Sequence, residues 1–142
     1  MIAAVAQDRN SKLAEYLELL HAMAYEIDRS MHAIAQNSLP TLEDSIAIQQ
    51  VLADRLRELA NDLSDAAPKD PATSPRQQDE ELVSQIRGAA DKLQSLNRRY
   101  SALLRLSSRS VALMVSLLNS YKGQIQEGSG PRLKQQTWSC RA

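Results

Sequence analysis

Residues 13–34 read LAEYLELLHAMAYEIDRSMHAI. Apolar residues recur in this stretch at alternating spacings of four and three positions, the heptad pattern that places one stripe of a helix against its neighbours. The stripe consists of Leu13, Leu17, Leu20, Ala24, Ile27, Met31 and Ile34. Asn37-Ser38-Leu39-Pro40 ends the helix, because the residue before a proline is pushed out of the helical conformation. A long helix is therefore predicted over about residues 8–38, packed along one side.

A second helix is predicted over about residues 41–66. Thr41 is its expected N-cap, with Asp44 as the reciprocal capping partner. Its apolar stripe has one polar member, Gln49, and consists of Leu42, Ile46, Gln49, Ala53, Leu56, Ala60 and Leu63. A polar, proline-rich linker follows at about residues 67–74.

A third and longer helix is predicted over about residues 75–122, with proline at its first position. Its stripe consists of Leu82, Ile86, Ala89, Leu93, Leu96, Tyr100 and Leu103, and it resumes at Met114, Leu117 and Tyr121 after Ser107 and Ser110. Residues 123–142 are rich in Gly, Gln and Ser and predict a flexible tail. The sequence thus predicts an all-α antiparallel three-helix bundle or coiled coil, formed by one domain over residues 1–122.

The composition agrees with helices. The 142 residues include only 4 Gly, 4% aromatic residues and no Phe, which disfavours a β-sandwich or barrel. A single cysteine, Cys140, cannot form an internal disulfide, so a reducing compartment is expected. The N-terminus has no basic start and only a short apolar run, and no stretch approaches the ~18–20 apolar residues of a membrane span. We therefore expect a cytoplasmic protein without membrane insertion.

The chain offers no pattern typical of catalysis or metal binding. It has no glycine-rich phosphate loop and no Cys–His spacing for zinc. Its two histidines, His21 and His32, would lie ~16 Å apart along one helix, too far to share a metal ion. We therefore expect no enzyme activity, no cofactor and no metal.

Charge is distributed unevenly although the formal net charge is zero. Residues 1–66 carry 11 acids and 5 bases, whereas residues 92–142 carry 1 acid and 9 bases. No carboxylate occurs from Lys92 to Gln126. Nucleic acid is not expected as a partner, because the acidic first half would repel phosphate and few aromatic side chains are available for stacking.

Helix lengths point to an interaction surface. At about 1.5 Å per residue, the predicted helices are about 46, 39 and 72 Å long. Two shorter helices cannot cover the far part of the third, roughly residues 105–122, if all three start from a common end. That segment is apolar nearly all round the helix, and such a helix needs burial on more than one side. A protruding third helix with an exposed apolar patch is therefore expected.

Three interpretations of this segment stay open. The helix breaks at Ser107-Ser108 and folds back on the bundle, or it forms a homodimer interface, or it binds the amphipathic segment of another protein. Met114 is soft and unbranched, which suits a surface that adapts to a partner. Ser107 and Ser110 interrupt the heptads and disfavour a long uniform coiled coil. A self-associating structural coiled-coil protein without a client is therefore the alternative function.

Residues 93–121 resemble the last long helix of the FlgN-like flagellar export chaperones, and the similarity extends over about residues 10–130. It rests on Asn97, Leu103-Leu104, the apolar run Val111–Leu118, Tyr121, and a glycine of the tail, Gly123 or Gly128. The chain departs from the family pattern at Tyr100, where a second Asn is frequent, and at Gln49-Gln50, where the family often has a Lys.

The resemblance implies a cytosolic chaperone of the flagellar type III secretion system. Its clients would be the hook-associated proteins of the hook–filament junction, whose disordered amphipathic terminal segment is bound and protected before secretion. The implied client-binding residues are Leu103, Leu104, Val111, Met114, Leu117 and Leu118. Tyr121 would contact the export apparatus.

Overall fold

The computed structural model describes residues 2–66 and 77–127, which form three α-helices: α1 (Ile2–Ala35), α2 (Leu39–Asp65) and α3 (Gln77–Glu127). These described ranges contain no strand, so the all-α prediction is confirmed. The helices begin or end up to six residues from the predicted bounds. The predicted linker at 67–74 and the helix start at Pro75 lie outside the described residues. The flexible tail predicted from residue 123 is wrong at its start, because α3 continues to Glu127, and its remainder from residue 128 lies outside the described residues.

The chain divides into two compact units, residues 1–103 and 104–142, where the sequence suggested one domain over 1–122. The division has a physical reason, because α3 contributes buried side chains such as Ala89 and Tyr100 before Leu103 and none from Leu104 to Gly123. Each unit is described by itself below.

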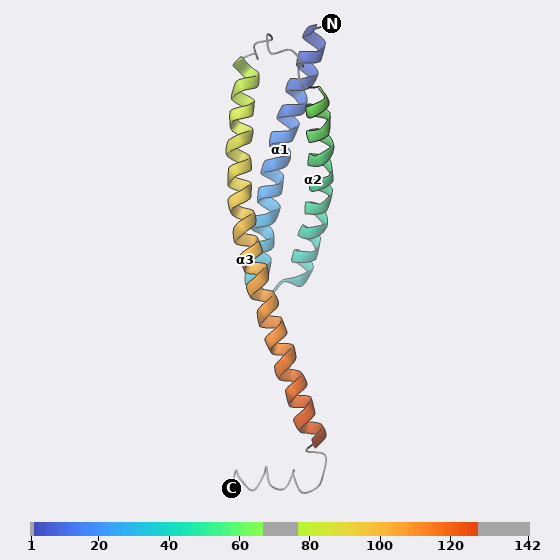
Figure 1. Ribbon diagram of the computed structural model, residues 1–142, viewed down its shortest axis with the longest axis vertical. Helices are drawn as coiled ribbons and strands as arrows, with labels where there is room; N and C mark the ends of the chain where they lie inside the picture. The colour runs from blue at the N-terminus through green and yellow to red at the C-terminus, as the bar shows by residue number, and fades with distance from the viewer. Residues whose placement is uncertain (1, 67–76, 128–142) are drawn as a thin grey trace. The chain divides into compact units, whose positions relative to one another are not determined.

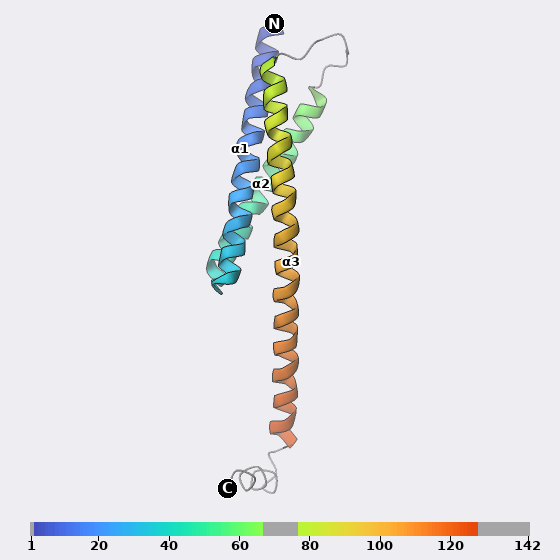
Figure 2. The ribbon, with the colours of Figure 1, turned by 90° about the vertical axis from the view of Figure 1, so that its left-hand side faces the viewer.

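The first unit is the predicted antiparallel three-helix bundle. In Figure 1, α1 lies between α2 and the first half of α3, and α2 runs opposite to the other two helices. Figure 2, turned by 90°, again shows α1 beside the first half of α3. The core centres on Met23 and Ile27 of α1 and Tyr100 of α3. Partly buried apolar side chains of all three helices pack around this centre: Met31, Ile34, Leu52, Ala53, Leu56, Leu93 and Leu96.

The first helix ends in a left-handed residue. Asn37 has φ 54°, a conformation that asparagine tolerates better than most residues. The backbone N–H of Ser38 donates to the carbonyl of Ala33 at 2.8 Å, and that of Asn37 donates to Ile34 at 3.1 Å. This pair of bonds is a Schellman motif, which satisfies the last free carbonyls of the helix. The first helix therefore ends at Ala35, three residues before the predicted end, and Asn37 rather than Pro40 ends it, since Leu39 before the proline is helical.

The second helix begins two residues before the predicted start at residue 41. Leu39 is its first residue and Pro40 occupies its first turn, where the missing N–H of proline is tolerated. Ser38, not Thr41, stands at the N-cap, and it makes no side-chain bond to the backbone there. Its hydroxyl donates instead to the Thr41 hydroxyl at 2.8 Å. The predicted Thr41–Asp44 capping pair is therefore wrong, since Asp44 bonds to Arg29 of α1 instead.

The buried stripe of α2 differs from the one that its apolar residues predicted. Its most buried side chains are Leu59, 1% exposed, and Ser45, 0% exposed. Neither belongs to the predicted stripe, of which Ile46 is 37% exposed. The observed stripe, Ser45, Gln49, Leu52, Leu56 and Leu59, shares Gln49 and Leu56 with the predicted one, whose other members except Ile46 are partly buried. Two of its members are polar, so an apolar pattern does not reveal it.

A buried chain of hydrogen bonds joins α1 to α2 at these polar positions. The Gln49 side-chain amide donates to the Ser30 hydroxyl at 2.7 Å, and the Ser30 hydroxyl donates to Ser45 at 2.9 Å. The Ser45 hydroxyl reaches the Glu26 carboxylate at 2.8 Å. Glu26 is only 7% exposed, and Arg29 compensates its charge at 3.3 Å. Every buried side chain in the chain of bonds therefore has a partner, as burial of polar groups requires.

Exposed ion pairs add further links between α1 and α2. Arg55 lies 2.7 Å from Glu15, and Arg29 lies 2.8 Å from Asp44. The pKa of the Arg29 guanidinium lies above its usual value, chiefly because its side chain donates to Asp44. The pKa of Arg55 is raised in the same way, chiefly by its bond to Glu15. Such solvent-exposed pairs orient the helices more than they stabilise them.

Leu59→Ala tests the observed stripe of α2. Removing a fully buried leucine side chain leaves a cavity, so we expect the free energy of unfolding to fall by about 2–5 kcal/mol. Urea unfolding followed by circular dichroism at ~222 nm measures it. Val51→Ala is the matched control in the same helix, because Val51 is 68% exposed, and it should change stability by less than about 0.5 kcal/mol. Equal effects of the two substitutions would contradict the assigned stripe.

Ser45→Ala tests the buried polar chain. The substitution removes the acceptor of Ser30 and a donor to Glu26, so we expect a loss of about 1–3 kcal/mol in unfolding free energy. Ser64→Ala, at an exposed serine of the same helix, should be close to neutral. Combining Ser45→Ala with Ser30→Ala should cost less than the sum of the single losses, because both residues belong to one network. Strict additivity would show that the bonds act independently.

Candidate functional site

All seven residues that the resemblance implicates lie on α3. Leu103 is half-buried and is the last residue of the first unit. Leu104 is 38% exposed and belongs to the second unit. The remaining five are well exposed, with fractions from 57% for Leu118 to 70% for Leu117: Val111, Met114, Leu117, Leu118 and Tyr121. An exposed row of large apolar side chains is unusual on a soluble surface and marks an interaction site.

The helix brings these residues to one side. At about 100° of rotation per residue, all seven fall within an arc of about 140°. Leu103, Met114 and Tyr121 lie close to one line along the helix, with Leu117 on one side of that line and Leu118 on the other. Tyr121, to which the resemblance gives a separate role, is therefore the C-terminal end of the same surface.

Three further exposed side chains widen this surface and were not among the predicted site residues. They are Leu106, Leu113 and Val115, which are 60%, 67% and 50% exposed. All three lie in the segment of about residues 105–122 that the sequence predicts to be exposed and apolar, but the resemblance gives them no role. We call the whole exposed set the apolar face of α3: Leu104, Leu106, Val111, Leu113, Met114, Val115, Leu117, Leu118 and Tyr121.

The apolar face leaves a polar strip on the other side of the helix. This strip consists of Arg105, Ser108, Arg109, Ser116, Asn119 and Ser120, all exposed. The segment is therefore amphipathic, and the expectation that it is apolar nearly all round is wrong. The apolar arc of about 200° also contains Ser107 and Ser110 near its middle.

The charges of this segment are all positive and unpaired within the described residues. Arg105, Arg109 and Lys122 form no ion pair there, and no carboxylate occurs between Lys92 and Gln126. A partner helix with acidic residues beside its apolar stripe would complement both features.

One helix, over Gln77–Gly123, is long and apolar enough to span a membrane by length and composition, although the sequence suggested no such stretch. Its most apolar window has a mean hydropathy of 1.3 and none of it is buried. One helix of this kind is weak evidence for a membrane span. The polar strip with Arg105 and Arg109 fits a helix that buries only its apolar side and keeps the other side in water.

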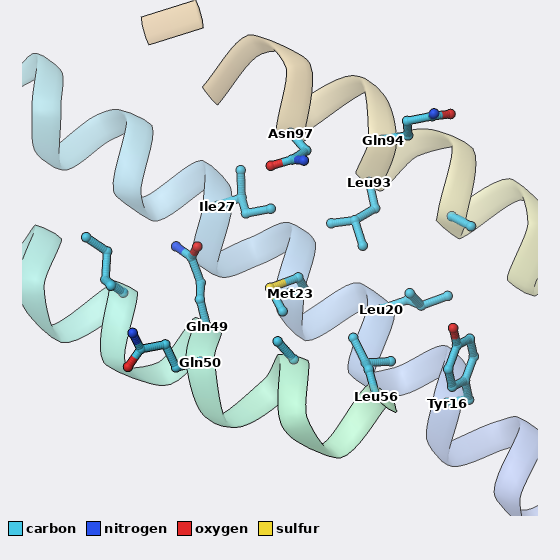
Figure 3. Close-up of a pocket in the computed structure, with 13 residues that line it drawn as sticks. Tyr16, Leu20, Met23, Ile27, Gln49, Gln50, Leu56, Leu93, Gln94 and Asn97 are labelled. Carbon is cyan, nitrogen blue, oxygen red and sulfur yellow. The ribbon is translucent and has the colours of Figure 1, made fainter. Parts of the chain in front are cut away.

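A second apolar surface lies wholly within the first unit. It is an open groove of about 650 Å³, lined by all three helices of the bundle. In Figure 3, Met23 of α1, Leu56 of α2 and Leu93 of α3 point into it. The amides of Gln49 and Asn97 lie at its rim, and its lining contains no charged side chain. The sequence did not predict this groove.

Within the described residues, no three His, Cys, Asp or Glu side chains are grouped so that they could hold a metal ion. What the apolar face and the groove offer is apolar area, which drives association by its removal from water. Comparison with family models, curated proteins and solved structures gave no match for this chain.

Proposed function

We propose that this protein is a non-enzymatic, cytosolic export chaperone of the FlgN-like kind. It binds the amphipathic terminal segment of a hook–filament junction protein and keeps that segment from assembling before secretion. The observation that carries the proposal is the apolar face of α3, a continuous row of exposed side chains from Leu104 to Tyr121. Exposed apolar area of this kind marks an interaction site.

The energy of such a contact comes from apolar burial. A client helix that removed roughly 500 Å² of this face from water would gain about 12 kcal/mol before any cost is subtracted. Ordering a disordered client segment and immobilising both partners consume a large part of that gain. The result is a reversible complex, which suits a chaperone that must release its client at the export apparatus.

The polar border of the face selects among amphipathic helices. At about 100° per residue, Arg109 lies about 40° beyond the edge of the apolar arc and Lys122 falls in line with Leu104 at the C-terminal end of the face, whereas Arg105 lies on the opposite side of the helix. A client segment with acidic residues flanking its apolar stripe is favoured, since like charges across an interface are costly. Basic amphipathic segments are disfavoured for the same reason.

Tyr121 has a place in this proposal at the C-terminal end of the apolar face. It is 66% exposed, and its hydroxyl gives a contact with the export apparatus a polar anchor. A client helix that extends along the whole face covers Tyr121, whereas a shorter one leaves it free. Recognition by the export apparatus would thus depend on how far the client reaches.

Met114→Asp combined with Leu117→Asp tests the proposal. Two carboxylates in the middle of the apolar face should weaken the binding of a fluorescently labelled junction-protein terminal peptide at least 100-fold, as measured by fluorescence anisotropy, because a bound client would have to bury them unpaired. Helicity by circular dichroism should be retained, since both side chains are more than 60% exposed.

Ser116→Asp combined with Asn119→Asp is the matched control. It adds the same two charges to the same helix turns, but on the polar strip, where they stay in solvent, so it should weaken peptide binding at least tenfold less than the substitutions on the apolar face. Unfolding of the Met114/Leu117 variant would show that these residues belong to a core. A stable homodimer whose mass the peptide does not change would favour the alternative, a self-associating structural protein.

A further inference from the structure

The groove of the first unit is an apolar surface that the chaperone proposal does not use. Its floor is formed by Leu20, Met23 and Ile27 of α1. One wall belongs to α2 and the other to α3, where Ala90 is exposed. Three helices thus leave a site for a fourth, in the way that a helix lies between its neighbours in a four-helix bundle.

We propose that this groove receives the apolar face of α3 from a second copy of the chain, so that two copies bind each other reciprocally through the groove of one and the helix of the other. The inference concerns the free protein and stands whether or not the client is a junction protein. Its support comes from matching length and opposite charge.

The dimensions of the two surfaces match. The α1 residues that line the groove run from Tyr16 to Ile27, which is about 17 Å of helix or three turns. The exposed residues from Val111 to Tyr121 cover about 15 Å, also close to three turns. Val111, Met114, Leu118 and Tyr121 follow the i, i+3, i+7, i+10 spacing by which a helix anchors itself in a groove.

The two units carry opposite net charge. Residues 1–103 contain 11 basic and 16 acidic side chains, a net charge of −5, whereas residues 104–142 contain 6 basic and 1 acidic side chains, a net charge of +5. The groove itself is uncharged, so no charge has to be buried when the helix enters it. Attraction between the first unit of one copy and the second unit of another therefore steers the encounter without a desolvation cost inside the groove.

A second copy of the chain supplies a reciprocal pair of contacts. The groove is lined on one side by α3 residues from Ala90 to Asn97. The apolar face of each copy lies in the groove of the other, so the two contacts are equivalent and double the buried area, as in an isologous dimer.

Ala90→Arg tests the proposal in the full chain by sedimentation equilibrium. The exposed alanine stands in the groove wall, and arginine would both fill the groove and repel the basic helix of the second copy. We expect the dissociation constant of the dimer to rise at least tenfold. Ser84→Arg adds the same charge to an exposed site of α3 about 120° away from Ala90, and it should leave the constant within about twofold. Gln50→Arg, on the α2 wall, repeats the test from the other side.

Mixing two variants identifies the arrangement. Ala90→Arg blocks the groove but keeps the helix, whereas Met114→Asp with Leu117→Asp blocks the helix but keeps the groove. Each variant alone should be monomeric, and their mixture should form a heterodimer through the one intact pair of surfaces. Raising the salt concentration from about 0.05 M to about 0.5 M should weaken the wild-type dimer, because the attraction between the units is screened.

Other outcomes overturn the inference. Three results would each exclude the reciprocal dimer. The wild-type chain stays monomeric up to high protein concentration, the dimer survives Ala90→Arg and Gln50→Arg, or the mixture of variants forms no heterodimer. Survival of the dimer would indicate pairing of two α3 helices with each other. Ala90→Arg should bind the client peptide at least as tightly as the wild type, so a failure of the groove proposal is distinct from a failure of the chaperone proposal.

Discussion

Along α3, apolar side chains before Leu103 pack in a core, whereas those after it are exposed to solvent, and the rest of this molecule depends on that contrast. Before Leu103, α3 supplies Ala89 and Tyr100 to a core shared with α1 and α2. After it, α3 continues as one helix whose large apolar residues are 38–70% exposed. A helix can keep this surface only because its first half is anchored by packing, since an isolated amphipathic helix is marginally stable in water.

Much of the fold was accessible from the sequence because its signals are local. The heptad spacing that predicts α1 acts within a few residues, and so does the break between α1 and α2, although the left-handed Asn37 and not Pro40 makes it. The buried sides of α1 and α2 were predicted only in part, because they include the polar residues Glu26, Ser30, Ser45 and Gln49. A pattern of apolar residues assumes that interiors are apolar. Here the interior between α1 and α2 contains a hydrogen-bonded chain instead, and only the arrangement of both helices shows it.

The candidate site was predictable in part for similar reasons. The apolar residues of Val111–Leu118 are neighbours in the sequence, so the sequence alone reveals this run. Leu106, Leu113 and Val115 belong to the segment that the sequence predicts to be exposed and apolar, but the resemblance that assigns the site residues does not include them. The polar strip of Arg105 and Arg109 was not expected, because the segment was predicted to be apolar nearly all round. The groove of the first unit was beyond sequence reasoning, since its volume depends on the spacing of three helices and not on any residue pattern.

The serine–glutamine–glutamate chain between α1 and α2 has a mechanical consequence. All of its bonds are made at one alignment of the two helices. Sliding α2 along α1 by one turn would leave the Glu26 carboxylate and the Ser30 hydroxyl buried without hydrogen-bond partners. The bonds therefore fix how α1 and α2 are aligned. Any guest that widens the space between the three helices must then do so by displacing the α3 wall, which no comparable buried polar bond holds within the described residues.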